Sequence, residues 1–143
     1  MVGLMIAGSA ILLIGIGCLH VYWAFGGSWG SNHVIPKSAK LEHPVFSPGK
    51  FVTLFVSFLL FLAAGLLILQ GGLFKFVYPN ILVNAGCWAC MIVFGLRVVG
   101  DFKYFGLFKK VRHTLFSRYD TYLFIPICAW FCFIFYIAIQ IGR

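Results

Sequence analysis

The chain has 143 residues, which is the size of one domain. Hydrophobic residues make up 62% of it and charged residues 10%, against roughly 45–50% and about 25% in soluble domains. An aqueous fold cannot bury that much apolar surface, so the composition predicts an integral membrane protein. In such a protein we expect the net charge of +8 to contact membrane lipid and not nucleic acid.

Four apolar segments, taken in chain order, each meet the roughly 20-residue length of an α-helical span. They run over residues 2–25, 51–70, 80–99 and 122–141. None shows the alternation of apolar and polar residues that a membrane β-barrel strand needs. The sequence therefore predicts an all-α fold, an integral membrane four-helix bundle that residues 1–143 form as a single transmembrane domain.

The first segment ends in LHVYWAFGGSWG, residues 19–30. Its aromatic residues fit a belt at headgroup depth, and its adjacent glycines fit a helix stop. His20 lies inside that stop, where a polar side chain normally faces protein or a water-filled cavity. Three roles stay open for it: a hydrogen-bonded packing residue, a member of a ligand site, or a surface group. The segment lacks a positive n-region, so we expect a retained helix and not a cleaved signal peptide.

Basic residues are distributed unevenly between the two sides of the predicted bundle. With four spans, the loops 26–50 and 100–121 share one side of the membrane. Nine of the eleven bases fall there or at the adjoining end of the third span, namely Lys37, Lys40, Lys50, Arg97, Lys103, Lys109, Lys110, Arg112 and Arg118. The positive-inside rule then predicts that both loops are cytosolic and that both termini lie outside.

The segment RVVGDFKYFGLFKKVRHTLFSRYDT, residues 97–121, follows the third span. Arg97 and Asp101 are four residues apart, so they can pair if the helix continues through Gly100. Much of residues 102–119 separates at helical spacing into an apolar face and a basic face that includes Lys109. This pattern predicts a short amphipathic interfacial helix between the third and fourth spans, with a solvated basic loop as the alternative. Pro126, in the first turns of the fourth span, is expected to kink that helix mildly.

The cysteines fall mainly inside the predicted spans. CWAC, residues 87–90, has the spacing of thiol oxidoreductases, but the loops hold no second cysteine pair to relay electrons. A thiol in a span behaves as a small apolar group, so we interpret these cysteines as packing residues. Neither a zinc-ligand spacing nor a phosphate-binding glycine loop is present, and we expect no metal and no cofactor.

The motifs LHVYWAFGGSWG and RVVGDFKYFGLFKKVRHTLFSRYDT, with IP at residues 35–36 and PIC at 126–128, carry a resemblance. The chain resembles, over nearly its whole length, a family of small bacterial membrane proteins catalogued as a domain of unknown function. The resemblance implies four transmembrane helices in a bacterial inner membrane and adds no catalytic residues. The positions that carry it are His20, Tyr22, Trp23, Gly26, Gly27, Gly30, Pro36, Arg97, Gly100, Asp101, Gly106, Lys109, Asp120 and Pro126.

Three functions are compatible with the sequence. The first is a binding protein that holds an anionic lipid headgroup or a similar amphiphile at the cytosolic interface, through Trp23, Arg97, Tyr104, Lys109 and Arg112. The second is an intramembrane enzyme for a lipid-soluble substrate, with His20 as general acid–base and Asp101 or Asp120 to orient it. The third is a small transporter, which the absence of a mid-span carboxylate disfavours. The small-molecule ligand is unknown and a homo-oligomer stays open.

The polar residues at the inner ends of the spans lead to one structural expectation. Topology brings the ends of the first and third spans and the start of the fourth to the same depth. A histidine and an arginine at that depth need partners or a solvated cavity. We therefore expect one site, in which Asp101 neutralises Arg97 and His20 meets Asp120 or a ligand, formed by His20, Trp23, Arg97, Asp101 and Asp120.

Overall fold

The structure is a computed structural model that describes residues 1–30, 49–73, 80–100, 106–109 and 115–142. All its regular elements in those ranges are helices, which confirms the predicted all-α class. They are α1 (Val2–Ala24), α3 (Lys50–Gln70), α4 (Ile81–Val99), α5 (Leu115–Tyr119), the π-helix η1 (Asp120–Phe124) and α6 (Ile125–Ile141).

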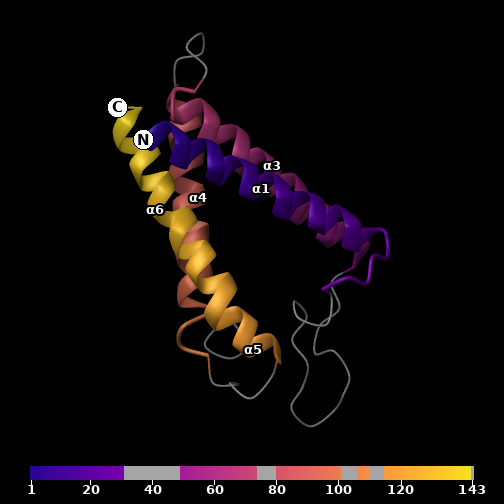
Figure 1. Cartoon of the computed structure of the whole chain (residues 1–143). Coiled ribbons are helices and arrows are strands. Elements are labelled where there is room, and N and C mark those ends of the chain that lie inside the picture. Colours follow the sequence, from indigo (N-terminus) through magenta and orange to yellow (C-terminus); the bar gives the residue numbers. More distant parts are fainter. Residues whose placement is uncertain (31–48, 74–79, 101–105, 110–114, 143) are drawn as a thin grey trace.

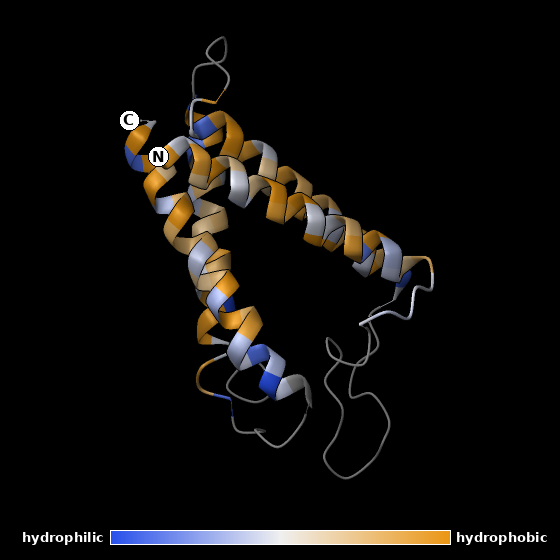
Figure 2. Cartoon of the chain, viewed as in Figure 1, coloured by the Kyte–Doolittle hydropathy of each residue, from blue (hydrophilic) through white to orange (hydrophobic). Residues whose placement is uncertain are grey.

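Four helical segments of the described chain are long and apolar enough to cross a membrane. They are Val2–Ala24, Lys50–Gln70, Ile81–Val99 and Ser117–Ile141. The last begins five residues before the predicted start at residue 122, because α5 and η1 continue into α6 as one helical rod. In Figure 2 hydrophobic residues predominate along each of these helices, as a multi-pass membrane protein requires.

The helices form two antiparallel hairpins. The first hairpin consists of α1 and α3, and the second consists of α4 with the rod of α5, η1 and α6. The hairpins meet at the end where both termini lie, which we call the junction end, and they diverge toward the other end, the open end (Figure 1). The loop between α1 and α3 and the loop between α4 and α5 both leave the helices at the open end.

The core joins both hairpins. Thirteen buried apolar side chains form one cluster, in which α1 contributes three residues and α6 five. They are Ile6, Ala10, Leu13, Ala63, Ala64, Leu67, Val83, Cys87, Phe131, Ile134, Phe135, Ala138 and Ile139. Helices in lipid gain no hydrophobic driving force from one another, so close packing of such side chains supplies the attraction.

Polar contacts supplement this packing within and between the hairpins. The hydroxyl of Ser57 donates to the carbonyl of Gly17 over 2.8 Å, which ties α3 to α1. Across the hairpins, the indole Nε1 of Trp130 on α6 donates to the hydroxyl of Ser9 on α1 over 2.8 Å. Ser9 is buried, so this bond satisfies a hydroxyl that lipid could not.

The cysteines of the CWAC motif contribute to packing. Cys87 is fully buried in the core, and its thiol donates to the carbonyl of Leu66 on α3 over 3.6 Å. Cys87 and Cys90 are both free thiols and form no disulfide with each other. These contacts support the interpretation of Cys87 as a packing residue.

Pro126 is accompanied by a wider helix instead of a simple kink. Proline lacks an amide hydrogen, and its ring clashes with the carbonyl four residues earlier. The preceding turn is a π-helix, in which the amide of Ile125 donates to the carbonyl of Asp120, five residues back. The extra residue in that turn changes the direction in which Asp120 points, and Asp120 is the centre of the site described next.

Candidate functional site

Asp120 is fully buried and accepts three hydrogen bonds from other described residues. Its Oδ1 accepts from the Nη2 of Arg97 on α4 over 2.7 Å. Its Oδ2 accepts from the Nζ of Lys109 over 2.8 Å and from the amide of Gly106 over 2.9 Å. Removal of a carboxylate from water is costly unless charges and donors replace the water, and these three donors do so. Asp120 therefore joins α4, η1 and the turn before α5.

Gly106 gives that turn its shape. Its φ of +86° is a left-handed conformation that glycine adopts without strain. A Cβ atom at this position would overlap the carbonyl oxygen of Val99 and lie 2.5 Å from the Cα of Gly100. The neighbouring amide of Leu107 donates to the carbonyl of Val98 over 2.9 Å. The turn thus folds back onto the end of α4, which directs the amide of Gly106 at Asp120.

Lys109 is held on both sides of its ammonium group. Its Nζ donates to Asp120 and also to the hydroxyl of Thr121 over 2.6 Å. That hydroxyl in turn donates to the carbonyl of Ser117, one helical turn earlier, over 3.0 Å. The side chain of Lys109 is 3% exposed. We call Arg97, Gly106, Lys109, Asp120 and Thr121 the Asp120 cluster.

This burial corrects one expectation from the sequence. Lys109 was expected on the exposed basic face of an amphipathic helix over residues 102–119. Residues 106–109 instead form a turn, and Lys109 is buried against Asp120. The glycine at residue 106 breaks the helix, because its left-handed conformation and its contact with Gly100 leave no room for a continuous helical path. The helical part of the segment that the structure describes is α5.

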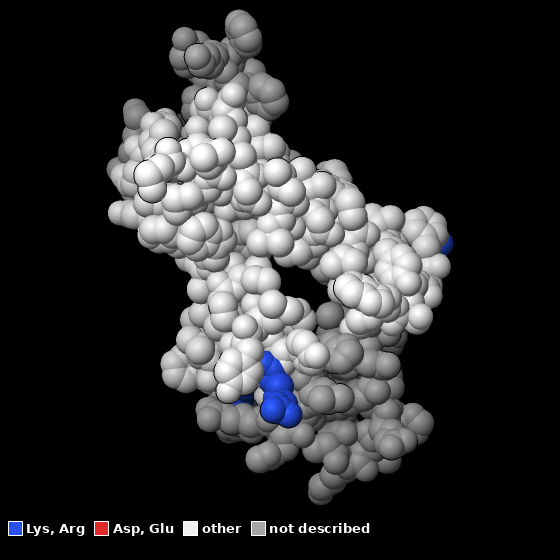
Figure 3. Space-filling view, in the orientation of Figure 1, with Lys and Arg blue, Asp and Glu red and all other residues white. Residues whose placement is uncertain are grey.

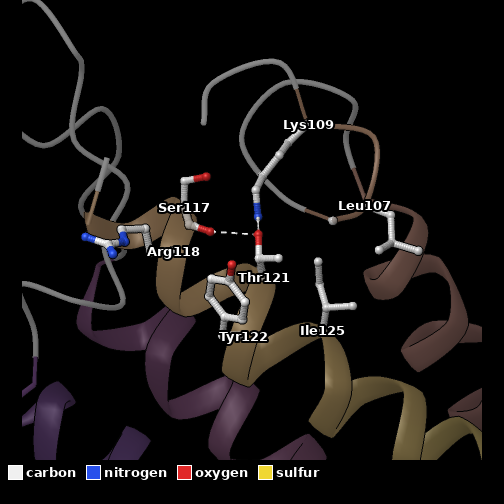
Figure 4. A pocket seen from close by; sticks show the side chains of 8 residues that line it. Leu107, Lys109, Ser117, Arg118, Thr121, Tyr122 and Ile125 are labelled. Atoms are coloured by element: carbon white, nitrogen blue, oxygen red, sulfur yellow. Dashed lines mark hydrogen bonds between the residues drawn. The ribbon is translucent and has the colours of Figure 1, made fainter. Parts of the chain in front are cut away.

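A pocket of about 320 Å³ lies beside the Asp120 cluster, at the open end of the second hairpin. We call it the Lys109 pocket. Figure 4 shows Lys109 reaching toward Thr121, with Arg118 and Ser117 on the α5 side. The pocket is lined by Gly106, Leu107, Lys109, Ser117, Arg118, Thr121, Tyr122 and Ile125.

Among the residues that the structure describes, the charges at the pocket do not balance. Asp120 carries one negative charge against the two positive charges of Arg97 and Lys109, which leaves the cluster with one net positive charge. Arg118, exposed on the pocket wall, adds a second. Asp120 is the only carboxylate in the described part of the chain. Figure 3 shows basic surface at this end. Such a site favours an anion.

The structure brings together part of the site expected from the sequence. Arg97, Lys109 and Asp120 are in direct contact. Asp101, Tyr104 and Arg112 lie outside the described residues, and so does the expected pair of Arg97 with Asp101. Among the described residues, Arg97 pairs with Asp120.

His20 and Trp23 lie on the first hairpin, away from the Asp120 cluster (Figure 1). The Nδ1 of His20 is 2.8 Å from the carbonyl oxygen of Ile16, one turn earlier. Its ring packs edge-on against Trp23 with a centroid distance of 5.2 Å, and the Nε1 of Trp23 donates to the carbonyl of Trp29. The expected contact of His20 with Asp120 is therefore absent between these two described residues, because the hairpins diverge.

Of the eight pocket residues, only Lys109 was proposed as ligand-binding from the sequence, and the polar side chains that sequence reasoning missed include Ser117, Arg118 and Thr121. The sequence did hold a signal for two of them, since Ser117 and Thr121 are four residues apart and precede a proline within one helix. Hydroxyls at that spacing share a helical face. The position of Arg118 on a pocket wall depends on the fold of the 106–109 turn, which no spacing in the sequence reveals.

The chain was compared with protein families, with curated proteins and with solved structures. A family model described as "Protein of unknown function (DUF3995)" matches residues 13–135. That match spans most of the chain, and the chain therefore belongs to this family. No curated protein and no solved structure matches it. The family description assigns no activity, so the evidence for function rests on the site itself.

Proposed function

We propose that this family member is a membrane protein that binds an anionic amphiphile, such as an acidic phospholipid, with its headgroup in the Lys109 pocket. One observation carries the proposal. In the described part of the chain, one buried carboxylate holds two cations, and a third cation, Arg118, lies on the wall of the adjoining pocket. This arrangement leaves a positive potential in a partly desolvated site, where the attraction of an anion is stronger than in water.

The lining residues suggest how the ligand lies. The guanidinium of Arg118 supplies donors in a planar fork that suits phosphate or carboxylate oxygens. Leu107, Tyr122 and Ile125 supply apolar surface for the part of the ligand next to its headgroup. Asp120 acts as a positioning residue, since it fixes Lys109 at the pocket edge and accepts no ligand itself.

The proposal includes a membrane side. The open end carries the loops with most of the basic residues, so we place the pocket at the cytosolic leaflet of a bacterial inner membrane, by the positive-inside rule. Acidic phospholipids in that leaflet then reach the pocket by lateral diffusion. A soluble ligand would need no apolar wall, which is the reason for favouring an amphiphile.

The contacts favour binding over the enzyme hypothesis. That hypothesis needs His20 beside Asp120, and the two side chains lie on different hairpins in this conformation. The hydroxyl of Thr121 is the nearest alternative nucleophile, but its hydrogen is directed at the carbonyl of Ser117 and it accepts from Lys109. No polar contact in the described part of the chain supports the transporter hypothesis in particular.

Retention of lipid by variants of the pocket tests the proposal. The full chain, purified in mild detergent, is examined by native mass spectrometry for bound phospholipid. Arg118→Ala should lower retention of acidic phospholipid about tenfold, which corresponds to the loss of roughly one charged hydrogen bond. Lys50→Ala is the matched control, because Lys50 is an exposed cation of the first hairpin that lies over the ring of Phe25. Equal retention by both variants and the wild type would overturn the proposal.

A further inference from the structure

One face of α1 is packed at the junction end and open at the other. Ser9, Leu13, Ile16 and His20 recur at intervals of three or four residues, so they share one face of the helix. Ser9 and Leu13 are buried, and Ser9 accepts the hydrogen bond of Trp130 on α6. Farther along, Ile16 and His20 are only half-buried. The face that begins against the second hairpin thus loses contact with it toward the open end.

The contact of Ser9 with Trp130 sets a register between α1 and α6. The two helices are antiparallel, so residues at equal steps from this contact lie at equal heights. His20 is eleven residues after Ser9, and Tyr119 is eleven residues before Trp130. Eleven residues of α-helix span about 16 Å, and the stretch from Tyr119 to Trp130 is somewhat shorter because it includes the π-helical turn η1. His20 therefore lies close to the level of Tyr119 and of the Asp120 cluster.

The two helices are nevertheless apart at that height. Figure 1 shows that the C-terminal end of α1 and the segment α5 are well separated at the open end. Figure 3 shows a hollow between the two hairpins. On the second hairpin, Leu123 is 45% exposed and Tyr119 40% exposed. Leu123 lies seven residues before Trp130, and Ile16 lies seven after Ser9, so these two apolar side chains are at one level.

We propose that the two hairpins close about the Ser9–Trp130 contact and bring His20 and Trp23 to the Lys109 pocket, which becomes an enclosed site around an acidic phospholipid headgroup. The inference rests on the proposed function for its ligand, while the register of closure rests on the Ser9–Trp130 contact alone. Closure extends the packing at Ser9 and Leu13 farther along α1 in the same register. In that register, the numbers of two opposing residues sum to 139, as they do for Ser9 and Trp130.

The ligand supplies the free energy that selects the closed state. Two apolar helix faces gain little by leaving lipid for each other, so the open and closed states of the unliganded protein differ by a small free energy. A bound headgroup contacts His20 only in the closed state, and a ligand shifts an equilibrium by its difference in affinity for the two states. The imidazole adds a polar group from the first hairpin to the cations of the second, and Trp23 covers the site from the water side.

Crosslinking of engineered cysteines tests the register. In the full chain with the five native cysteines replaced by alanine, Ile16→Cys and Leu123→Cys are introduced together. The protein is reconstituted in vesicles of acidic phospholipid or of zwitterionic phospholipid, and a short bifunctional thiol reagent is added. We expect this pair to crosslink at least threefold more in the acidic vesicles. The control pair is Ile14→Cys with Leu123→Cys, because Ile14 is exposed on the opposite side of α1. The control pair should not crosslink in either vesicle.

The outcomes separate closure from ligand binding. Crosslinking of the Ile16 pair no higher than the control in both vesicles overturns closure, even if Arg118→Ala still loses lipid and the proposed function stands. Equal crosslinking of the Ile16 pair in both vesicles overturns the coupling to the ligand. If the cysteine-free protein is unstable, the same two cysteines are introduced into a variant that keeps the buried Cys87, and both are spin-labelled. Electron paramagnetic resonance then gives the distance between the two labels. A single long distance in both vesicles also overturns closure.

His20 has its own test. His20→Ala should lower lipid retention severalfold. His20→Gln, which keeps a polar group at similar reach, should restore part of that retention. A merely structural histidine would change thermal stability in both variants and leave the ratio of bound acidic to zwitterionic lipid unchanged. That unchanged ratio would overturn the role of His20 in the closed site.

Discussion

At the residue scale, the molecule depends on how Asp120 is neutralised. Its carboxylate lies among the spans with no exposed surface, and two cations and one backbone amide replace its water. The pairs are unequal, because Lys109 is buried while the side chain of Arg97 is 31% exposed. Lys109 therefore depends on Asp120 more than Arg97 does, because water can solvate the partly exposed guanidinium of Arg97 but not the buried ammonium of Lys109.

The variant Asp120→Asn tests this dependence. It keeps the side-chain size but removes the negative charge that Arg97 and Lys109 share. Loss of one partner from a buried ion pair costs about 3–5 kcal/mol, so we expect a clear fall in the thermal unfolding temperature of the purified protein. Lys109→Met removes one cation and leaves the Arg97–Asp120 pair, so its unfolding temperature should fall less than that of Asp120→Asn. An unfolding temperature of Asp120→Asn equal to that of the wild type would contradict the account.

At the element scale, η1 is the unusual segment. An ordinary α-helix over residues 120–124 would rotate Asp120 relative to α6, and the hydrogen bonds to Arg97 and Lys109 depend on that angle. The π-helical turn before Pro126 fits both needs, since it relieves the clash of the proline ring and fixes the direction of Asp120. The helix is widened where the site is formed, as is common for single π-helical turns.

The variant Pro126→Ala tests the role of η1. In an ordinary helix, replacement of an interior proline by alanine stabilises by about 3 kcal/mol. Here we expect no such gain, because a helix that becomes regular turns Asp120 away from its two cations. The unfolding temperature should stay level or fall, and retention of acidic phospholipid should drop toward that of Arg118→Ala. A more stable protein with full lipid retention would show that the proline alone, and not the site, requires the wide turn.

At the scale of the whole molecule, the two hairpins differ in what they carry. The first is apolar and holds Ser9, Ser57 and His20 on its packed or facing sides, while the second holds the Asp120 cluster at its open end. The junction end, where both hairpins meet, holds the shared core. This division lets one end of the molecule stay fixed while the other changes its spacing.

Cysteine labelling tests the membrane orientation. Leu107→Cys, in a background without native cysteines, should resist an impermeant thiol reagent in intact cells and react after lysis, because the positive-inside rule predicts that the open end is cytosolic. Leu107 is 53% exposed, whereas Ser117, an obvious choice from the sequence, is 2% exposed and unsuited to labelling. Leu73→Cys, beyond the other end of α3, should react in intact cells. The reverse labelling pattern would invert the proposed topology.

The sequence by itself determined the all-α class, the four apolar helices and the clustering of polar groups at one end. Those features follow from local composition and length, because a span must satisfy its own backbone and needs about 20 apolar residues to cross the bilayer. The sequence also indicated Arg97, Lys109 and Asp120 as members of one polar region.

Only the tertiary structure decided which of those groups pair. Helical spacing favoured a pair of Arg97 with Asp101, which lies outside the described residues, and the topology of the spans favoured a contact of His20 with Asp120. Among the described residues, the structure pairs Asp120 with Arg97 and Lys109. The left-handed turn at Gly106 and the π-helical turn before Pro126 aim these groups, and both depend on contacts between segments far apart in the chain. The hairpins diverge where the close packing between them ends, and this divergence separates His20 from the cluster. The residue pattern of a single helix does not predict where that packing ends.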